Sequence, residues 1–183
     1  MRLNDVQLRK LHKRFGLLDF DGNGYIELAD YRNLGRRFQP AFGLSPDSPA
    51  AKAAVDTYTE LFRRLHRAGD TDGDGRIDEE EFVASMARGL IERPDGFDRG
   101  MVPVLEVIMD VCDRDGDAEI SRDEFARLLR VYATPEPDIG LALKNLAWDL
   151  PGGMSRTAFI RATREFYCSP DPAAPGNWFF GSF

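Results

Sequence analysis

The chain has 183 residues, 43% of them hydrophobic, so we expect one domain or two closely packed small ones around a substantial core. A formal net charge of −7 argues against a general nucleic-acid binder. We expect no secretory signal and no membrane span, because no apolar run approaches the ~20 residues that cross a bilayer. Cys112 and Cys168 lack metal-ligand spacing, and we interpret them as reduced thiols of a cytoplasmic protein.

Apolar residues at helical spacing predict a first helix after Asn4, a plausible N-cap. The helix leads into residues 19–30, DFDGNGYIELAD, which have the spacing of a twelve-residue calcium loop. Oxygen-bearing side chains fall at positions 1, 3, 5, 9 and 12, Gly24 is at position 6, and position 7 offers its backbone carbonyl. The predicted ligands are Asp19, Asp21, Asn23, Tyr25, Glu27 and Asp30.

Position 12 of this loop departs from the usual glutamate. Asp30 is one methylene shorter, so it reaches an ion less easily with both oxygens. A smaller site should result, at which Mg²⁺ competes better.

After a break at residues 42–48, Ser48 and Pro49 predict the start of a second long helix, over 49–68. The segment that follows it, residues 70–81 (DTDGDGRIDEEE), matches the calcium-loop pattern at every position. The alternative is an acidic turn, in which the five carboxylates at ligand positions would repel one another with nothing gained. The predicted ligands are Asp70, Asp72, Asp74, Arg76 (through its carbonyl), Asp78 and Glu81.

A helix continues from this loop, residues 93–100 are interpreted as a linker, and Pro103 suits the first turn of the next helix. A third loop, residues 113–124 (DRDGDAEISRDE), keeps every ligand but has Ala118 at the turn position. If φ must be positive there, the strain is about 1 kcal/mol, which weakens the site without removing it. The predicted ligands are Asp113, Asp115, Asp117, Glu119 (through its carbonyl), Ser121 and Glu124.

The place of a fourth loop is residues 147–158, AWDLPGGMSRTA, where the ligands at positions 1, 5 and 12 are missing. We therefore predict a silent, structural hand. Such units pair because one alone cannot cover its apolar face. We expect Ile26 to face Ile77 and Ile120 to face Met154 in short two-stranded ladders.

Residues 167–183, YCSPDPAAPGNWFFGSF, are too apolar for a free tail, although their prolines and Gly176 argue against a helix. We expect this tail to fold back and fill an apolar cleft. The predicted fold is all-α, with four helix–loop–helix units in two paired lobes (1–92 and 93–166) and the tail (167–183) docked on the core.

The four loops, the silent last hand and the ending DPAAPGNWFFGSF resemble the sarcoplasmic calcium-binding proteins and their bacterial, calerythrin-like members, over essentially the whole chain. The resemblance implies a two-lobed EF-hand monomer that buffers Ca²⁺ and Mg²⁺ inside cells. It also implies that the C-terminal aromatics occupy the cleft that other EF-hand proteins use for targets.

Three functions follow from these observations. The first is a calcium buffer or transporter with three bound ions, which would bring the formal charge from −7 to −1. The second is a sensor that exposes an apolar cleft and regulates a protein partner, although five methionines are few for a Met-rich groove. The third is a calcium-gated carrier or oxygenase of a small aromatic ligand, against which the tail and the presence of only two histidines argue. No catalytic constellation is visible, so we do not expect an enzyme.

Overall fold

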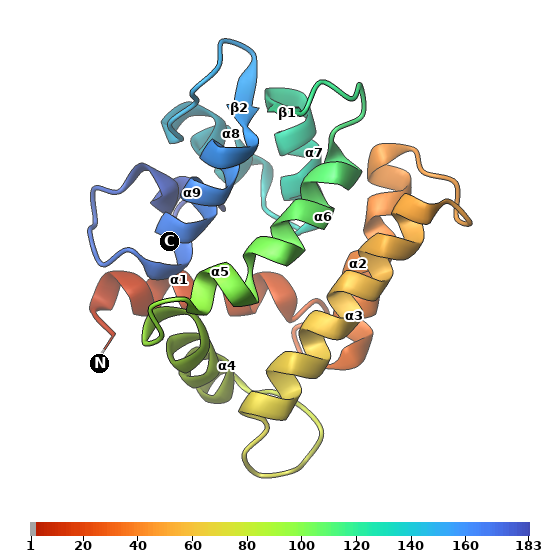
Figure 1. Cartoon of the computed structure of the whole chain (residues 1–183). Helices are drawn as coiled ribbons and strands as arrows, with labels where there is room; N and C mark the ends of the chain where they lie inside the picture. Colours follow the sequence, from red (N-terminus) through yellow and green to blue (C-terminus); the bar gives the residue numbers. More distant parts are fainter. Residues whose placement is uncertain (1–2) are drawn as a thin grey trace.

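The computed structural model describes residues 3–183 and is mostly helical (Figure 1). Its first half contains α1 (Asp5–Leu18), α2 (Leu28–Phe42), α3 (Pro49–Gly69), α4 (Glu79–Met86), a π-helical turn η1 (Ala87–Ile91) and α5 (Gly96–Gly100). The second half contains α6 (Val102–Cys112), β1 (Glu119–Ser121), α7 (Arg122–Val131), α8 (Glu136–Asn145), β2 (Gly153–Ser155), α9 (Arg156–Cys168) and a 3₁₀ turn η2 (Pro175–Trp178).

Side-chain caps begin the first long helices where the sequence predicts them. The backbone N–H of Gln7 donates to Asn4 Oδ1 at 2.9 Å, and that of Ala51 donates to Ser48 Oγ at 3.2 Å. Each bond satisfies a backbone donor that has no partner within its own helix. Within residues 3–183, no helix is both long and apolar enough to span a membrane.

The loops pair as predicted. Ile26 and Ile77 exchange backbone hydrogen bonds of 2.8 and 3.0 Å, and β1 runs antiparallel to β2 with Ile120 opposite Met154. The β1–β2 ladder lies at the top of Figure 1 and the loop of residues 70–81 at the bottom, so the two pairs of loops occupy opposite ends of the molecule. The expectation of four helix–loop–helix units in paired lobes is confirmed.

One continuous apolar core joins the two halves of the chain. Helix α3 packs on α6, and α2 packs on α7. At this junction the hydroxyl groups of Tyr58 and Tyr132 lie 2.6 Å apart and share a hydrogen bond. The division into units 1–92 and 93–166 stays a prediction, since the core runs across it.

Two segments are more regular than the sequence suggests. The predicted linker 93–100 contains α5, which packs against η1 so closely that a Cβ on Gly96 would lie 2.2 Å from the carbonyl oxygen of Gly89. The tail contains η2, because Pro175 takes a first position that needs no N–H donor. Tertiary packing and proline geometry thus outweigh the loop-like composition.

The C-terminal tail docks into the interior as expected. Phe179 and Phe180 are each 2% exposed and contact other aromatic rings edge-on, with centroid distances of 4.8–5.4 Å to their nearest neighbours. The ammonium of the buried Lys10 donates to Asn177 Oδ1 at 2.8 Å and to two carbonyl oxygens around the end of α9. Helix α1 therefore fixes the tail against α9.

The expectation that the tail fills the cleft holds only in part. Phe179 and Phe180 also border an apolar cavity of about 280 Å³ that reaches towards α3 and η1. The tail, which approaches from the α8 and α9 side, leaves this space open.

Candidate functional site

Three of the four loops share a network of backbone hydrogen bonds that turns their side chains inward. The carboxylate at position 1 accepts from the N–H at position 6 in each loop: Gly24 to Asp19 (2.9 Å), Gly75 to Asp70 (3.1 Å) and Ala118 to Asp113 (3.0 Å). The side chain at position 5 accepts from the N–H at position 7. These bonds involve Asn23 with Tyr25, Asp74 with Arg76, and Asp117 with Glu119, at 2.8 Å each.

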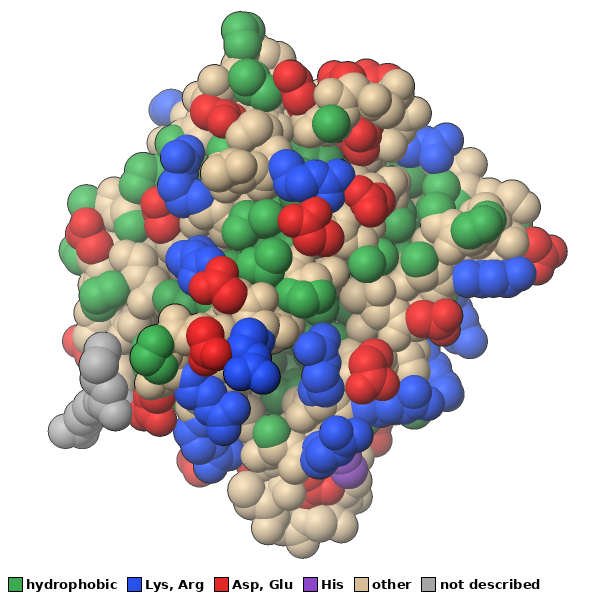
Figure 2. All heavy atoms as spheres, viewed as in Figure 1, with side chains coloured by type: hydrophobic (Ala, Val, Ile, Leu, Met, Phe, Trp, Pro, Cys, Tyr) green, Lys and Arg blue, Asp and Glu red, His purple; other side chains and the backbone are tan. Residues whose placement is uncertain are grey.

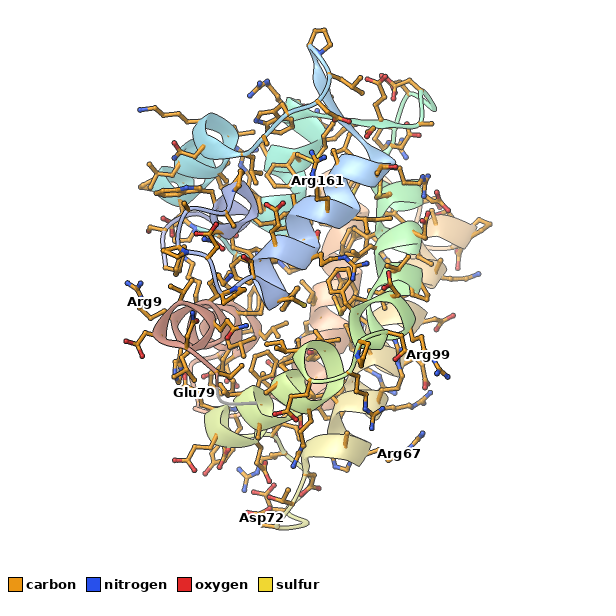
Figure 3. The ribbon with its side chains drawn as sticks, turned by 60° about the vertical axis from the view of Figure 1, so that its left-hand side comes forward. Arg9, Arg67, Asp72, Glu79, Arg99 and Arg161 are labelled. Carbon is orange, nitrogen blue, oxygen red and sulfur yellow. The ribbon has the colours of Figure 1, made fainter. Side chains whose placement is uncertain are left out.

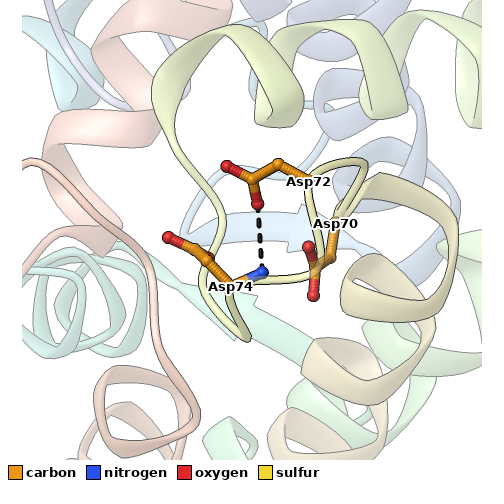
Figure 4. Close-up of side chains that lie close together, drawn as sticks. All are labelled: Asp70, Asp72 and Asp74. Carbon is orange, nitrogen blue, oxygen red and sulfur yellow. Dashed lines mark hydrogen bonds between the residues drawn. The ribbon is translucent and has the colours of Figure 1, made fainter.

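The first ligand positions converge in two loops. One oxygen from each of Asp70, Asp72 and Asp74 lies within 4.8 Å of the others, and Figure 4 shows the three carboxylates around the turn. Asp72 lies at the tip of its loop, as labelled in Figure 3. Asp113, Asp115 and Asp117 converge in the same way. Hard oxygen donors of this kind fit Ca²⁺.

Position 12 closes these two loops with a glutamate held at both oxygens. Glu81 Oε1 accepts from the N–H and the hydroxyl of Thr71 at 2.7 Å, and its Oε2 accepts from Asp78 N–H at 3.3 Å. The bonds from Thr71 lower the pKa of Glu81, which keeps the carboxylate charged. Glu124 is held equivalently by the N–H of Arg114 and by Ser121. Both carboxylates therefore span the loop from its end to its start.

Asp30 does not span its loop in this way. Its Oδ2 accepts from Glu27 N–H at 2.8 Å, but in the described chain no hydrogen bond joins it to Phe20 at position 2. Burial raises the pKa of Asp30, and the neighbouring carboxylates of Asp21 and Asp19 raise it further. The shorter side chain thus leaves this loop less tightly closed.

Ala118 adopts the left-handed conformation that its position demands, with φ of 64°. The equivalent glycines, Gly24 and Gly75, have φ of 85° and 84°. A Cβ is unfavourable in this region, so the third loop carries backbone strain that the other two lack.

The fourth loop uses its remaining carboxylate internally. Asp149 accepts from the N–H and the hydroxyl of Ser155 at 2.8 and 2.6 Å. Gly153 lets β2 approach β1, because a Cβ there would lie 2.3 Å from the carbonyl oxygen of Ile120. The arrangement supports the neighbouring loop without gathering a ligand set of its own.

Sequence reasoning missed two buried cations on α1, Lys10 and Arg14, which are 0% and 4% exposed. The available signal was helical spacing: Arg14 lies three residues after Leu11 and four before Leu18, on the apolar stripe. Thr71, which holds Glu81, was also missed, because position 2 is not a ligand position in the pattern.

Comparison with known proteins agrees with this geometry. The sequence profile of the EF-hand domain pair matches residues 8–87. Calerythrin from Saccharopolyspora erythraea is 28% identical over 86% of this chain and 90% of its own length. A sarcoplasmic calcium-binding protein from Perinereis vancaurica tetradentata is 24% identical over 97% of this chain and 98% of its own.

Among solved structures, a calcium-binding protein of Streptomyces coelicolor, described as a structural basis for prokaryotic calcium-mediated regulation, superposes with a TM-score of 0.76. It is 29% identical, and the match covers 90% of this chain and 99% of that one. With the three acidic loops, these likenesses identify the chain as an EF-hand calcium-binding protein of the calerythrin and sarcoplasmic calcium-binding protein type.

Proposed function

We propose that the protein is a monomeric, cytoplasmic Ca²⁺ buffer that binds three ions, at residues 19–30, 70–81 and 113–124. The support is the shared inward-turned geometry of these loops and the absence of a ligand set in residues 147–158. Mg²⁺ competes most at the first loop, because Asp30 is short and Mg²⁺ prefers smaller, more regular sites.

The observation that favours a buffer over a sensor is the way in which the tail is held. Lys10 binds it from α1, and Asp138 of α8 accepts from the N–H and the hydroxyl of Ser182 at 3.1 and 2.6 Å. Neither Lys10 nor Asp138 belongs to a calcium loop. The tail therefore has contacts that do not depend on ion binding, and a target helix would have to displace it.

A sensor remains the second candidate function. It is favoured by the likeness to the Streptomyces coelicolor protein, whose description refers to calcium-mediated regulation. In this alternative, Ca²⁺ loosens the tail and exposes the cleft to a protein partner.

Hydrogen exchange of the tail amides, with chelator, with Mg²⁺ and with Ca²⁺, separates the two functions. The N–H of Gly176 donates to Glu165 of α9 and reports directly on docking, whereas those of Asn177, Phe179 and Gly181 report on the turn within the tail. A buffer gives equal protection with Mg²⁺ and Ca²⁺. A Ca²⁺-specific loss of protection would overturn the buffer and favour the sensor.

Stoichiometry tests the three sites independently. Calorimetric titration should give three Ca²⁺ per chain, and Glu81→Gln should empty the central loop and leave two. Ser155→Ala, in the fourth loop, is the matched control and should leave the count at three. An unchanged count in Glu81→Gln would refute the assignment of that loop.

A further inference from the structure

The cavity beside the tail is large enough for a small molecule. Its volume of about 280 Å³ approaches that of known ligand pockets, roughly 300–1,000 Å³. It lies between α1, α3, α4, α6 and the tail. Its walls are mainly apolar, and they include Leu18, Leu65, Phe82, Met101, Val104 and Ile108.

One wall carries a buried cation whose donors are not satisfied. Arg14 is 4% exposed, and its Nε and Nη1 atoms have no hydrogen-bond acceptor within the described chain. Its guanidinium carbon lies 4.6 Å from the ring centroid of Tyr132 and 4.7 Å from that of Phe180. The rings stabilise the positive charge through their faces, but they do not accept its in-plane N–H groups.

The surroundings of Arg14 contain tyrosines rather than carboxylates. Burial disfavours its charge, yet the nearby Tyr167, Tyr132, Tyr31 and Tyr58 outweigh that effect, and the pKa of Arg14 is raised. No ion pair in the described part of the chain involves Arg14. Arg14 also lines the apolar cavity, so a permanently charged group with two unpaired donors and no ion pair lies beside an apolar space, which is strongly unfavourable.

The entrance to the cavity is also basic. Arg64 and Arg93 line it beside the half-buried Leu90 of η1, and Arg64 Nε is a second buried donor without an acceptor. Figure 2 shows several Lys and Arg side chains over the region of α3, α4 and α5, with Asp and Glu side chains among them. Arg64 and Arg93 place positive charge beside the cavity, which would attract an anion there despite the net charge of −7.

We propose that the cavity binds a small apolar carboxylate, with its hydrocarbon body against the apolar walls and its carboxylate accepting hydrogen bonds from Arg14. A guanidinium presents parallel donors that match the two oxygens of a carboxylate. A neutral apolar molecule would fill the space but leave these donors unsatisfied. The apolar walls select the hydrocarbon body of the ligand, and Arg14 selects its carboxylate.

The test compares octanoate with 1-octanol, which shares the hydrocarbon chain but lacks the charge, by calorimetric titration into the Ca²⁺-saturated protein. Octanoate should bind wild-type protein, and Arg14→Met should weaken it roughly 10- to 100-fold, the range typical of hydrogen bonds to charged groups. Binding of 1-octanol should be unchanged or stronger in the variant.

Arg9→Met is the matched control, because it removes the same charge from the same helix at an exposed position (Figure 3). It should bind octanoate like wild-type protein. Equal octanoate affinity in Arg14→Met and wild type, or an equal loss in Arg9→Met, would overturn the proposal.

A measurement on wild-type protein keeps the proposal testable if Arg14→Met fails to fold. The NMR signal of the Arg14 Nε–H should shift as octanoate is added, in step with the calorimetric affinity. An unmoved signal at saturating octanoate would show that water, rather than a carboxylate, satisfies this guanidinium, and would overturn the proposal.

Discussion

Ala118→Gly isolates the backbone strain of the third loop. Ala118 has φ of 64°, whereas glycine occupies the same turn position in the other two loops. The exchange removes a single methyl group and alters none of the predicted ligands. We therefore expect the variant to be more stable and to bind Ca²⁺ more tightly at residues 113–124.

The magnitude follows from two opposing effects. A left-handed residue with a Cβ is strained by roughly 1–2 kcal/mol. Glycine loses more chain entropy on folding, which costs about 0.5–1 kcal/mol. The net gain is about 0.5–1 kcal/mol, equivalent to a rise in melting temperature of roughly 1–4 °C for a chain of this size. Where the unbound loop escapes the strain, the same energy lowers the Kd of the third site by up to roughly fivefold.

Gly75→Ala is the reciprocal experiment. Gly75 has φ of 84°, and a Cβ there would meet no atom within 4 Å, so the substitution adds backbone strain without a clash. Thermal melting with chelator and with Ca²⁺, and Ca²⁺ titration against a competing chelator, should show opposite changes in the two variants. Changes of the same sign, or weaker binding in Ala118→Gly, would refute the strain argument.

Three further predictions concern the first loop and the tail. Asp30→Glu should raise the preference of the first loop for Ca²⁺ over Mg²⁺, because the longer side chain can reach the start of the loop; Ca²⁺ titration at fixed Mg²⁺ measures this, and an unchanged preference contradicts it. Phe179→Ala should lower the free energy of unfolding by about 3–5 kcal/mol in urea denaturation, since the ring is 2% exposed; a change below about 1 kcal/mol would mean that the tail is not part of the core. Asp138 makes the stability of the fold depend on pH: burial opposes its charge, but hydrogen bonds from Lys13 and Ser182 outweigh burial and lower its pKa. Because the folded value lies below the unfolded one, this stabilisation is complete above the ordinary pKa of 3.8 and is lost as pH falls through the folded value. Melting curves should therefore separate wild type from Asp138→Asn at neutral pH and converge in acid; a constant difference would remove Asp138 from this role.

The calcium loops were predictable because their chemistry is local. A twelve-residue turn aims alternate side chains at one point, so spacing alone predicts Asp70, Asp72 and Asp74 as neighbours. The same pattern predicted the silent hand and the pairing of Ile120 with Met154. The ladder forms between position 8 residues, which the loop pattern fixes.

The regularity of α5 and η2 was not predictable, because packing decides it. Gly96 and Gly100 have low helix propensity, but contact with η1 orders them. Pro175 argues against a long helix yet allows a single 3₁₀ turn. Local composition alone predicts neither α5 nor η2.

The sequence by itself determined the acidic loops, their order and the apolar character of the tail, since each depends on residues close together in the chain. Only the tertiary structure decided where the tail ends and the cavity begins, and that Arg14 faces this space without an acceptor. The aromatic residues around Arg14 come from α2, α3, α9, the end of α7 and the tail. Their meeting depends on how the two lobes pack, which no spacing along the chain specifies.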